Sequence, residues 1–263
     1  MSWKTAVRQL CPRIEKWIPP VPMSTGQRGR PCISDEAVFY RLVLFLRAGC
    51  SWEVFDLLLS TCGGTVSGRT VRRRLSTWRR LGVFESVCRE LQRMLPRAGV
   101  GYLDATFVRS RGGGNEEVGL TRHGKGSKLQ VICDEYSRPI SFLLLSANPA
   151  ECRSALELLR LSGLSLPLKV VADRAYDSDD LRDGASSFGT TLIVPHRRRR
   201  VRPARDQDLV AVFYRERWRV ERFFGWLAAW RRVATRWERG LQNYGSFLCL
   251  ALSLMYVQGG VCT

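Results

Sequence analysis

The hydrophobic pattern of the chain changes its period near residue 98, and this change constrains the fold more than any other feature. Before it, apolar residues recur every three or four positions, which is typical of amphipathic helices. After it come short apolar runs rich in β-forming residues, separated by further helical segments. We therefore expect an all-helical domain over residues 1–97 and an α/β domain over residues 98–263.

Proline and glycine divide the first domain into short helices, which we expect at 3–17, 34–47, 52–59, 68–81 and 84–94. In the segment 68–81, Val71, Leu75 and Trp78 form an apolar stripe. The other side of the same segment is basic, with Arg69, Arg72, Arg73, Arg74, Arg79 and Arg80. A short helix, a break and a basic amphipathic helix are the outline of a helix-turn-helix DNA-binding unit.

The alternative for this segment is a solvated basic face on a helical bundle. We favour DNA binding, because six arginines without a balancing carboxylate are costly to leave unpaired. Arg69, Arg72 and Arg73 are the DNA contacts expected from this helix.

The overall charge also indicates an anionic partner. The 263 residues include 42 Lys and Arg against 24 Asp and Glu, a net charge of +18. Nucleic acid is the first candidate partner, and an acidic membrane surface is the second. The hydrophobic fraction of 45% excludes a disordered polycation, because it is large enough to form a core.

Several other classes of protein are disfavoured. The apolar run at 247–257 is too short to span a bilayer, which takes about 20 residues. Residues 1–25 contain no apolar stretch of signal-peptide length. The nine cysteines show no zinc-binding spacing, and their odd number suggests reduced thiols in the cytosol.

In the second domain we expect strands at 100–107, 129–133, 140–146, 168–172 and 191–194. Helices are expected at 151–161, 179–188, 209–234 and 240–258. Three consecutive strands followed by crossover units predict a mixed sheet with helices packed against it.

Three acidic residues in this domain occupy positions suited to metal chemistry. Asp104 lies within an apolar strand, where a carboxylate must be paired, hydrogen-bonded or bound to a metal. Asp173 directly follows another apolar strand. Glu221 lies on the late helix, where Tyr214 and Arg217 share its face at spacings of three and four.

Converging carboxylates repel one another, and a divalent cation removes that conflict. Mg²⁺ or Mn²⁺ accepts oxygen ligands, and two such ions about 3.5–4 Å apart can promote phosphodiester displacement. Elsewhere, we interpret Asp177, Asp179, Asp180 and Asp183 as helix caps and first-turn charges. His123 is interpreted as a phosphate contact, and His196 is given no role.

Four sequence motifs carry a resemblance to a known family: Thr70-Val-Arg-Arg-Arg-Leu75, Leu103-Asp-Ala-Thr106, Ala172-Asp-Arg-Ala-Tyr-Asp177 and Arg217-Trp-Arg-Val-Glu-Arg222. In this order and spacing they resemble the DDE transposases of bacterial insertion sequences, in the IS-five family of the IS-four-like clan. The resemblance covers nearly the whole chain. It implies an RNase H-like catalytic domain in which Asp104, Asp173 and Glu221 bind two Mg²⁺ or Mn²⁺ ions.

The clan signature is Tyr, two residues, Arg, three residues, Glu, six residues, Lys. Tyr214, Arg217 and Glu221 match it, whereas Ala228 stands at the lysine position. Arg231 or Arg232 are the candidates to replace that lysine. DNA contacts are expected from two Lys residues beside the glycine-rich segment, from the basic loop after the last strand and from the late helix: Lys125, Lys128, Arg197, Arg198, Tyr214, Arg217 and Arg222.

The resemblance implies a function in DNA transposition. The protein would bind the terminal inverted repeats of its element, cut the DNA to leave a 3′-hydroxyl, and join that hydroxyl to target DNA. Double-stranded DNA would be its partner, it would act as a homodimer, and it would be found in the bacterial cytoplasm with the nucleoid. Two alternatives remain: a domesticated, non-catalytic DNA-binding regulator, and a metal-dependent nuclease without strand transfer.

Overall fold

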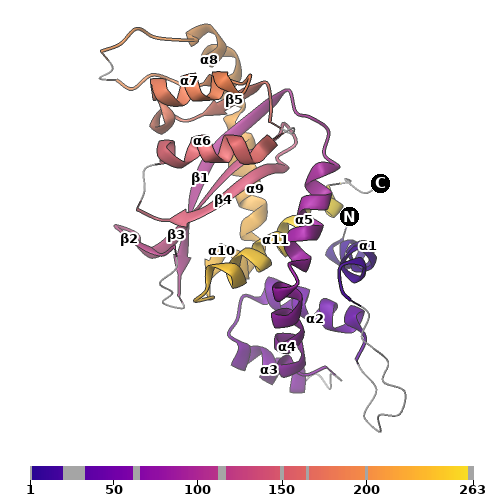
Figure 1. Ribbon diagram of the computed structural model, residues 1–263. Helices are drawn as coiled ribbons and strands as arrows, with labels where there is room; N and C mark the ends of the chain where they lie inside the picture. The colour runs from indigo at the N-terminus through magenta and orange to yellow at the C-terminus, as the bar shows by residue number, and fades with distance from the viewer. Residues whose placement is uncertain are drawn as a thin grey trace.

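The computed structural model describes residues 2–19, 33–61, 66–111, 117–148, 151–163, 166–198 and 201–259. A mixed β-sheet lies at the centre of the α/β part, and the N-terminal helices stand beside it (Figure 1).

The N-terminal part is helical, as the sequence predicts. Its helices are α1 (Trp3–Lys16), α2 (Asp35–Ala48), α3 (Trp52–Thr61), α4 (Gly68–Arg80) and α5 (Val83–Arg93). Ser2, Ser34 and Ser67 begin α1, α2 and α4, since each side-chain oxygen accepts a hydrogen bond from a backbone amide of the first turn. Gly49 ends α2 in the left-handed conformation that glycine adopts without strain.

The basic helix α4 has the expected two faces. Val71, Leu75 and Trp78 are buried, and four of its arginines are exposed: Arg69, Arg72, Arg73 and Arg80. The expectation that all six arginines lack a carboxylate partner is wrong for Arg74, which forms an ion pair with Asp35 at the start of α2. This contact fixes α4 against α2, and the sequence could not show it because 39 positions separate the two residues.

The sheet contains β1 (Val100–Ser110), β2 (Gly119–Thr121), β3 (Gly124–Cys133), β4 (Pro139–Ser146), β5 (Lys169–Ala172), β6 (Thr191–Ile193) and β7 (Thr235–Arg236). Its main order is β2-β3-β1-β5-β6, with β4 paired to β3 and β7 to β1. Strands β1, β3 and β4 are antiparallel neighbours, whereas β5 and β6 run parallel to β1. The predicted mixed sheet is therefore confirmed, and the hairpin of β2 with the first residues of β3 is an addition to it.

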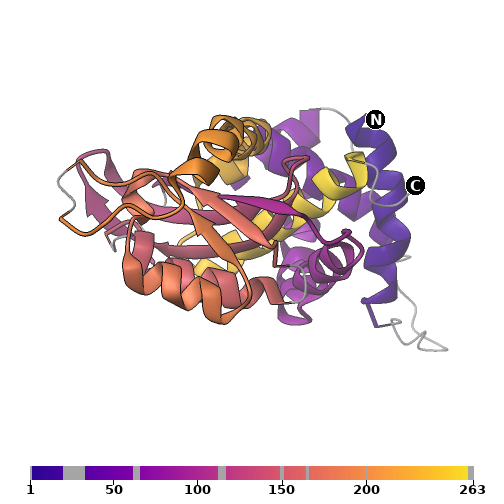
Figure 2. The same cartoon turned by 90° about the horizontal axis from the view of Figure 1, so that it is seen from above.

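Helices cover both faces of the sheet (Figure 2). Helices α6 (Glu151–Ser162) and α7 (Asp179–Ser187) pack on one face. Helices α9 (Trp218–Ala228) and α11 (Leu241–Gln258) pack on the other, and their apolar core continues into α1–α5. Among the described helices, none combines the length and the apolarity that spanning a bilayer requires.

The single helix expected over 209–234 is wrong. The chain forms α8 (Gln207–Phe213), a 3₁₀ turn η3 (Tyr214–Arg217), α9 and the short helix α10 (Arg231–Ala234). Tertiary contacts explain the breaks, because Arg217 in η3 bonds to β1 and Trp230 between α9 and α10 is buried in the core.

Candidate active site

The parallel pairing of β1 with β5 brings two of the predicted carboxylates together. Leu103 of β1 is the register partner of Ala172 of β5, so the next residues, Asp104 and Asp173, lie at the same level of the sheet. Asp104 pairs with Val131 across β3, and Val131 packs in the core with α9 and α11. Because paired residues share a face, the Asp104 side chain lies on the face that α9 covers.

Arg217 joins the third carboxylate to this pair. Its Nη1 donates to Asp104 Oδ2 at 2.8 Å, and its Nη2 donates to Glu221 Oε1 at 2.5 Å. The second contact follows from the spacing of four residues between Arg217 and Glu221. The side chains of Asp104 and Glu221 are 18% and 48% exposed, so the cluster opens to solvent on the Glu221 side.

Burial raises the pKa of Asp104 above its ordinary value. The amide of Ala105 and the Arg217 guanidinium act in the opposite direction, and Asp173 adds a repulsive charge. For Arg217, burial lowers the pKa, but the carboxylates of Asp104 and Glu221 outweigh it and the net shift is upward. The site is thus a partly buried group of carboxylates that attracts positive charge.

The residues fit a divalent ion by their chemistry. Carboxylate oxygens are the ligands that Mg²⁺ and Mn²⁺ prefer, and the Arg217 guanidinium supplies the positive charge between Asp104 and Glu221. Within the described part of the chain, no group of three or more His, Cys, Asp or Glu side chains is already arranged to hold a metal. An ion shared by Asp104 and Glu221 would therefore require Arg217 to leave its present contacts.

Asp173 lies at the start of a short 3₁₀ turn, η2 (Arg174–Tyr176). Its Oδ1 accepts the Ala175 amide at 2.8 Å, which caps the turn. Arg197 contacts the same turn, since its Nη2 donates to the carbonyl of Ala175 at 2.7 Å. Arg197, expected to bind DNA, therefore contacts the segment that carries Asp173.

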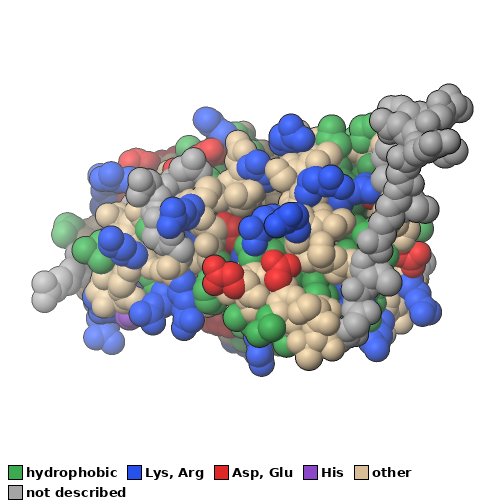
Figure 3. Space-filling view, turned by 90° about the horizontal axis from the view of Figure 1, so that it is seen from below, with side chains coloured by type: hydrophobic (Ala, Val, Ile, Leu, Met, Phe, Trp, Pro, Cys, Tyr) green, Lys and Arg blue, Asp and Glu red, His purple; other side chains and the backbone are tan. Residues whose placement is uncertain are grey.

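The exposed residues among the other predicted DNA contacts lie on α4 and in the α/β part. Arg69, Arg72 and Arg73 are exposed on α4, in the helical part of the molecule. Figure 3 shows the side of α3 and α4, where Lys and Arg cover more of the surface than Asp and Glu. Lys125 and Arg198 are exposed in the α/β part.

Lys128 and Arg222 are held by protein groups. Lys128 is 14% exposed and forms an ion pair with Glu151 at 3.4 Å. It lies on the face of the sheet opposite Asp104, since it is paired with Phe107, three residues along β1. Arg222 lies over the rings of Trp218 and Trp226, with 4.7 and 4.9 Å to the ring centroids.

The structure also places the signature residues and the candidates for the missing lysine. Tyr214 lies in η3, and the Arg217 guanidinium is 6.0 Å from its ring centroid, so the three signature residues are neighbours. Arg232, a candidate for the missing lysine, is 3% exposed and paired with Glu238 at 2.7 Å. Arg232 is therefore a core residue, whereas Arg231 and Ala228 are exposed.

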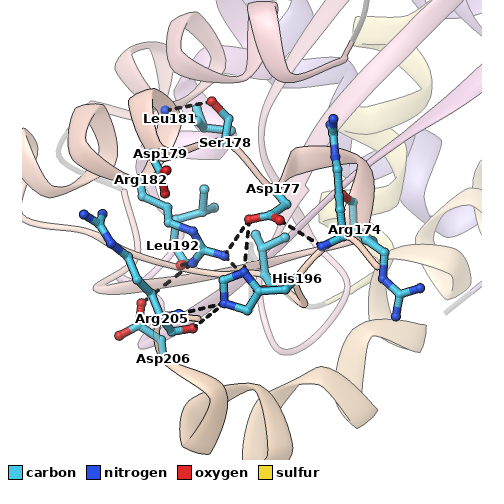
Figure 4. A network of polar contacts seen from close by, with 12 residues as sticks. Arg174, Asp177, Ser178, Asp179, Leu181, Arg182, Leu192, His196, Arg205 and Asp206 are labelled. Atoms are coloured by element: carbon cyan, nitrogen blue, oxygen red, sulfur yellow. Dashed lines mark hydrogen bonds and ion pairs between the residues drawn. The ribbon is translucent and has the colours of Figure 1, made fainter. Parts of the chain in front are cut away.

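Sequence reasoning missed the buried polar residues that support the site. The sequence pattern suggests a cap for Asp177 and no role for His196, but both lie in one network beside the turn after Asp173 (Figure 4). Gln130 is also buried, and its Nε2 donates to the hydroxyl of Tyr176 at 3.1 Å. For Gln130 the signal was its position inside an apolar strand, since buried polar groups need partners. Asp177 and His196 stand among polar residues, which gave no such signal.

Comparison with known proteins identifies the family of the chain. A family model described as the transposase DDE domain matches residues 96–256. A Burkholderia cepacia protein assigned as the transposase of insertion sequence element IS402 is 29% identical over 198 residues, covering 69% of this chain and 89% of that protein. A Brucella ovis protein assigned to insertion sequence element IS6501 is 32% identical over 134 residues, covering 50% and 98%.

The fold is also similar to that of a solved structure. The piggyBac transposase in a synaptic complex with hairpin DNA aligns with a TM-score of 0.58 at 11% identity, covering 98% of this chain and 75% of that one. This likeness confirms the RNase H-like fold class, with an added N-terminal helical region. With the family match over more than half of its residues, the chain belongs to the transposase DDE domain family.

Proposed function

We propose that the chain is the transposase of a bacterial insertion sequence of the IS-five family, and that it cuts the ends of its element and joins them to target DNA. Two observations support the proposal: Arg217 bridges Asp104 and Glu221, and the pairing of β1 with β5 brings Asp173 beside Asp104. Divalent ions are the cofactor that such a group of carboxylates would hold, and two ions are proposed.

The roles of the side chains follow from their positions. Asp104 and Asp173 offer oxygens from adjacent strands, and Glu221 offers a more exposed oxygen from α9. Bound divalent ions would supply activation of the attacking oxygen and neutralisation of the leaving one. When Arg217 leaves Asp104 and Glu221, its two terminal nitrogens are suited to a DNA phosphate, which it can bind in a bidentate manner.

DNA binding is assigned to two surfaces. The exposed arginines Arg69, Arg72 and Arg73 of α4 would hold the inverted repeat at the element end. Residues of the α/β part would hold the phosphates that lead to the cleavage point, and these are Lys125, Arg197, Arg198, Tyr214 and Arg222. Lys128 lies on the opposite face of the sheet and pairs with Glu151, so it would contact DNA away from the carboxylates. Pairing of two ends would need at least a homodimer.

Cleavage of DNA that carries the element ends tests the proposal. Asp104→Asn removes one carboxylate charge while keeping the side-chain shape, and it should abolish cleavage in Mg²⁺ or Mn²⁺ without weakening end binding. Asp183→Asn is the matched control, because Asp183 is exposed and lies on α7, away from β1. Cleavage by the Asp104 variant at the wild-type rate would contradict the assignment.

The same assay separates the alternatives. Joined products with a target plasmid indicate a transposase, and nicked products alone indicate a nuclease without strand transfer. End binding with no cleavage by the wild-type chain would indicate a DNA-binding regulator.

A further inference from the structure

A buried polar network lies beside the turn that follows Asp173 (Figure 4). At its centre is Asp177, whose side chain is only 1% exposed. Asp177 Oδ1 is 3.2 Å from Nη2 of Arg182, which is 4% exposed. Breaking an ion pair buried to this extent by removing one partner is strongly destabilising.

Arg182 ties Asp177 to the end of strand β6. Its Nη1 donates to the carbonyl of Leu192 at 3.0 Å, and its Nη2 donates to the carbonyl of Val194 at 2.9 Å. Asp206 also faces Nη1, at 3.7 Å. These contacts fix Asp177 relative to the sheet, although Asp177 itself lies in a loop.

The segment after β6 contacts Asp177 from the other side. The Arg197 amide donates to Asp177 Oδ2 at 2.9 Å. His196 Nδ1 lies 3.6 Å from Asp177 Oδ1, and the Arg205 amide donates to His196 Nε2 at 2.7 Å. The Arg205 carbonyl also lies 3.1 Å from Nε2, so one side of the His196 ring faces the Arg205 backbone and the other faces Asp177.

The network ends on the backbone next to Asp173. The Arg197 guanidinium donates to the carbonyls of Arg174 and Ala175, the two residues that follow Asp173. The amide of Ala175 in turn donates to Asp173 Oδ1. A displacement of Arg197 would therefore change the turn that sets the direction of the Asp173 carboxylate.

We propose that Asp177, Arg182, His196 and Arg197, the Asp177 clamp, position the Asp173 carboxylate for binding a divalent ion. This inference rests on the proposed function, because it gives the clamp a role in the same site. The clamp residues are positioning residues, since their contacts reach the ion only through Asp173. Supporting groups of this kind change metal affinity when they are removed, because the ligand loses its fixed orientation.

Two neighbouring ion pairs provide a matched comparison. Asp179 pairs with Arg202 at 2.7 Å, and Asp183 pairs with Arg205 at 2.9 Å. The Asp183 and Arg205 side chains are 67% and 49% exposed. Asp183 lies on α7, as Arg182 does, and it holds the segment after β6 through Arg205, but at the surface of the molecule. Asp183→Asn should therefore reveal the effect of loosening the loop without disturbing the turn at Asp173.

The experiment measures Mn²⁺ binding to the full chain by calorimetry and by electron paramagnetic resonance. Asp177→Asn should weaken Mn²⁺ binding by about 10–100-fold, and it should raise the Mn²⁺ concentration needed for half-maximal cleavage. High Mn²⁺ should restore the cleavage rate, and end binding without metal should stay unchanged. Asp183→Asn should bind Mn²⁺ as the wild type does.

A milder substitution guards against misfolding. His196→Ala removes one contact to Asp177 and should show a smaller effect of the same kind, together with faster amide hydrogen exchange at residues 174–177. If both clamp variants lower only the melting temperature and bind Mn²⁺ with wild-type affinity, the clamp is structural and the inference is wrong. If the wild type binds no Mn²⁺ at the site, the proposed function itself is contradicted.

Discussion

The strongest effect on stability is expected at the buried ion pair of Arg232 and Glu238. Their side chains are 3% and 6% exposed, and their charged groups approach to 2.7 Å. The Arg232 guanidinium also lies 3.8 Å from the ring centroid of Phe45 in α2 and donates to the carbonyl of Cys50. The pair therefore links the C-terminal part of the chain to the N-terminal helices.

Glu238→Gln would leave the Arg232 charge buried without a counter-charge. Breaking a buried pair in this way costs about 3–5 kcal/mol. We expect the lower end of that range, because the aromatic ring of Phe45 and the carbonyl of Cys50 still contact the guanidinium. A loss of about 3 kcal/mol corresponds to a fall in melting temperature of roughly 6–12 °C for a chain of this size.

Urea unfolding followed by tryptophan fluorescence and by circular dichroism measures this loss. The two signals should fall together in one transition, because the helical and α/β parts share a core. The control is Arg232→Met combined with Glu238→Gln, which removes both charges and should cost less than Glu238→Gln alone. A loss below about 1 kcal/mol, or a double variant less stable than the single one, would refute the reasoning.

Three further predictions concern DNA, pH and packing. In a binding assay across salt concentrations, Arg72→Ala should weaken end binding and reduce the slope of log affinity against log salt by about 0.9. Arg160 is an exposed arginine on α6, and Arg160→Ala should leave both the affinity and the slope unchanged. Burial raises the pKa of Asp104, so the contribution of the protonated carboxyl to folding stability is fully present below the ordinary pKa of 3.8 and is lost as the pH rises through the raised pKa. Because protons and Mn²⁺ compete for the Asp104 oxygens, the rise in melting temperature caused by Mn²⁺ should grow over the same pH range. Equal Mn²⁺-induced shifts in melting temperature at acidic and neutral pH would contradict this. Gly126→Ala should destabilise the β1–β3 pair by about 1–3 kcal/mol in urea unfolding, since a Cβ there would lie 2.4 Å from the Phe107 ring and from a β1 carbonyl.

Local patterns singled out Asp104, Asp173 and Glu221, and the resemblance to DDE transposases grouped them in one site. Asp104 interrupts an apolar strand and Asp173 follows another, but the order of elements did not show that these strands are neighbours. The contact of Arg217 with Glu221 follows from helical spacing. The five N-terminal helices follow from apolar periodicity and serine caps.

Features that depend on distant contacts could not be predicted. The 3₁₀ turn at Tyr214–Arg217 interrupts a segment with uniform helical pattern. Arg232 looks like a surface residue in sequence, yet it is buried because Glu238 and the carbonyl of Cys50 pair with it. In the clamp, Asp177 contacts His196 and Arg197, which lie about 20 residues away in sequence and are brought close only by the folded chain.

The most direct test of the central claim is a crystal structure of the chain soaked in Mn²⁺, with the ions located by anomalous scattering. We expect Mn²⁺ within bonding distance of Asp104, Asp173 and Glu221, with Arg217 displaced from the two carboxylates that it now bridges. An anomalous signal elsewhere, with Arg217 still bonded to Asp104 and Glu221 under saturating Mn²⁺, would contradict it.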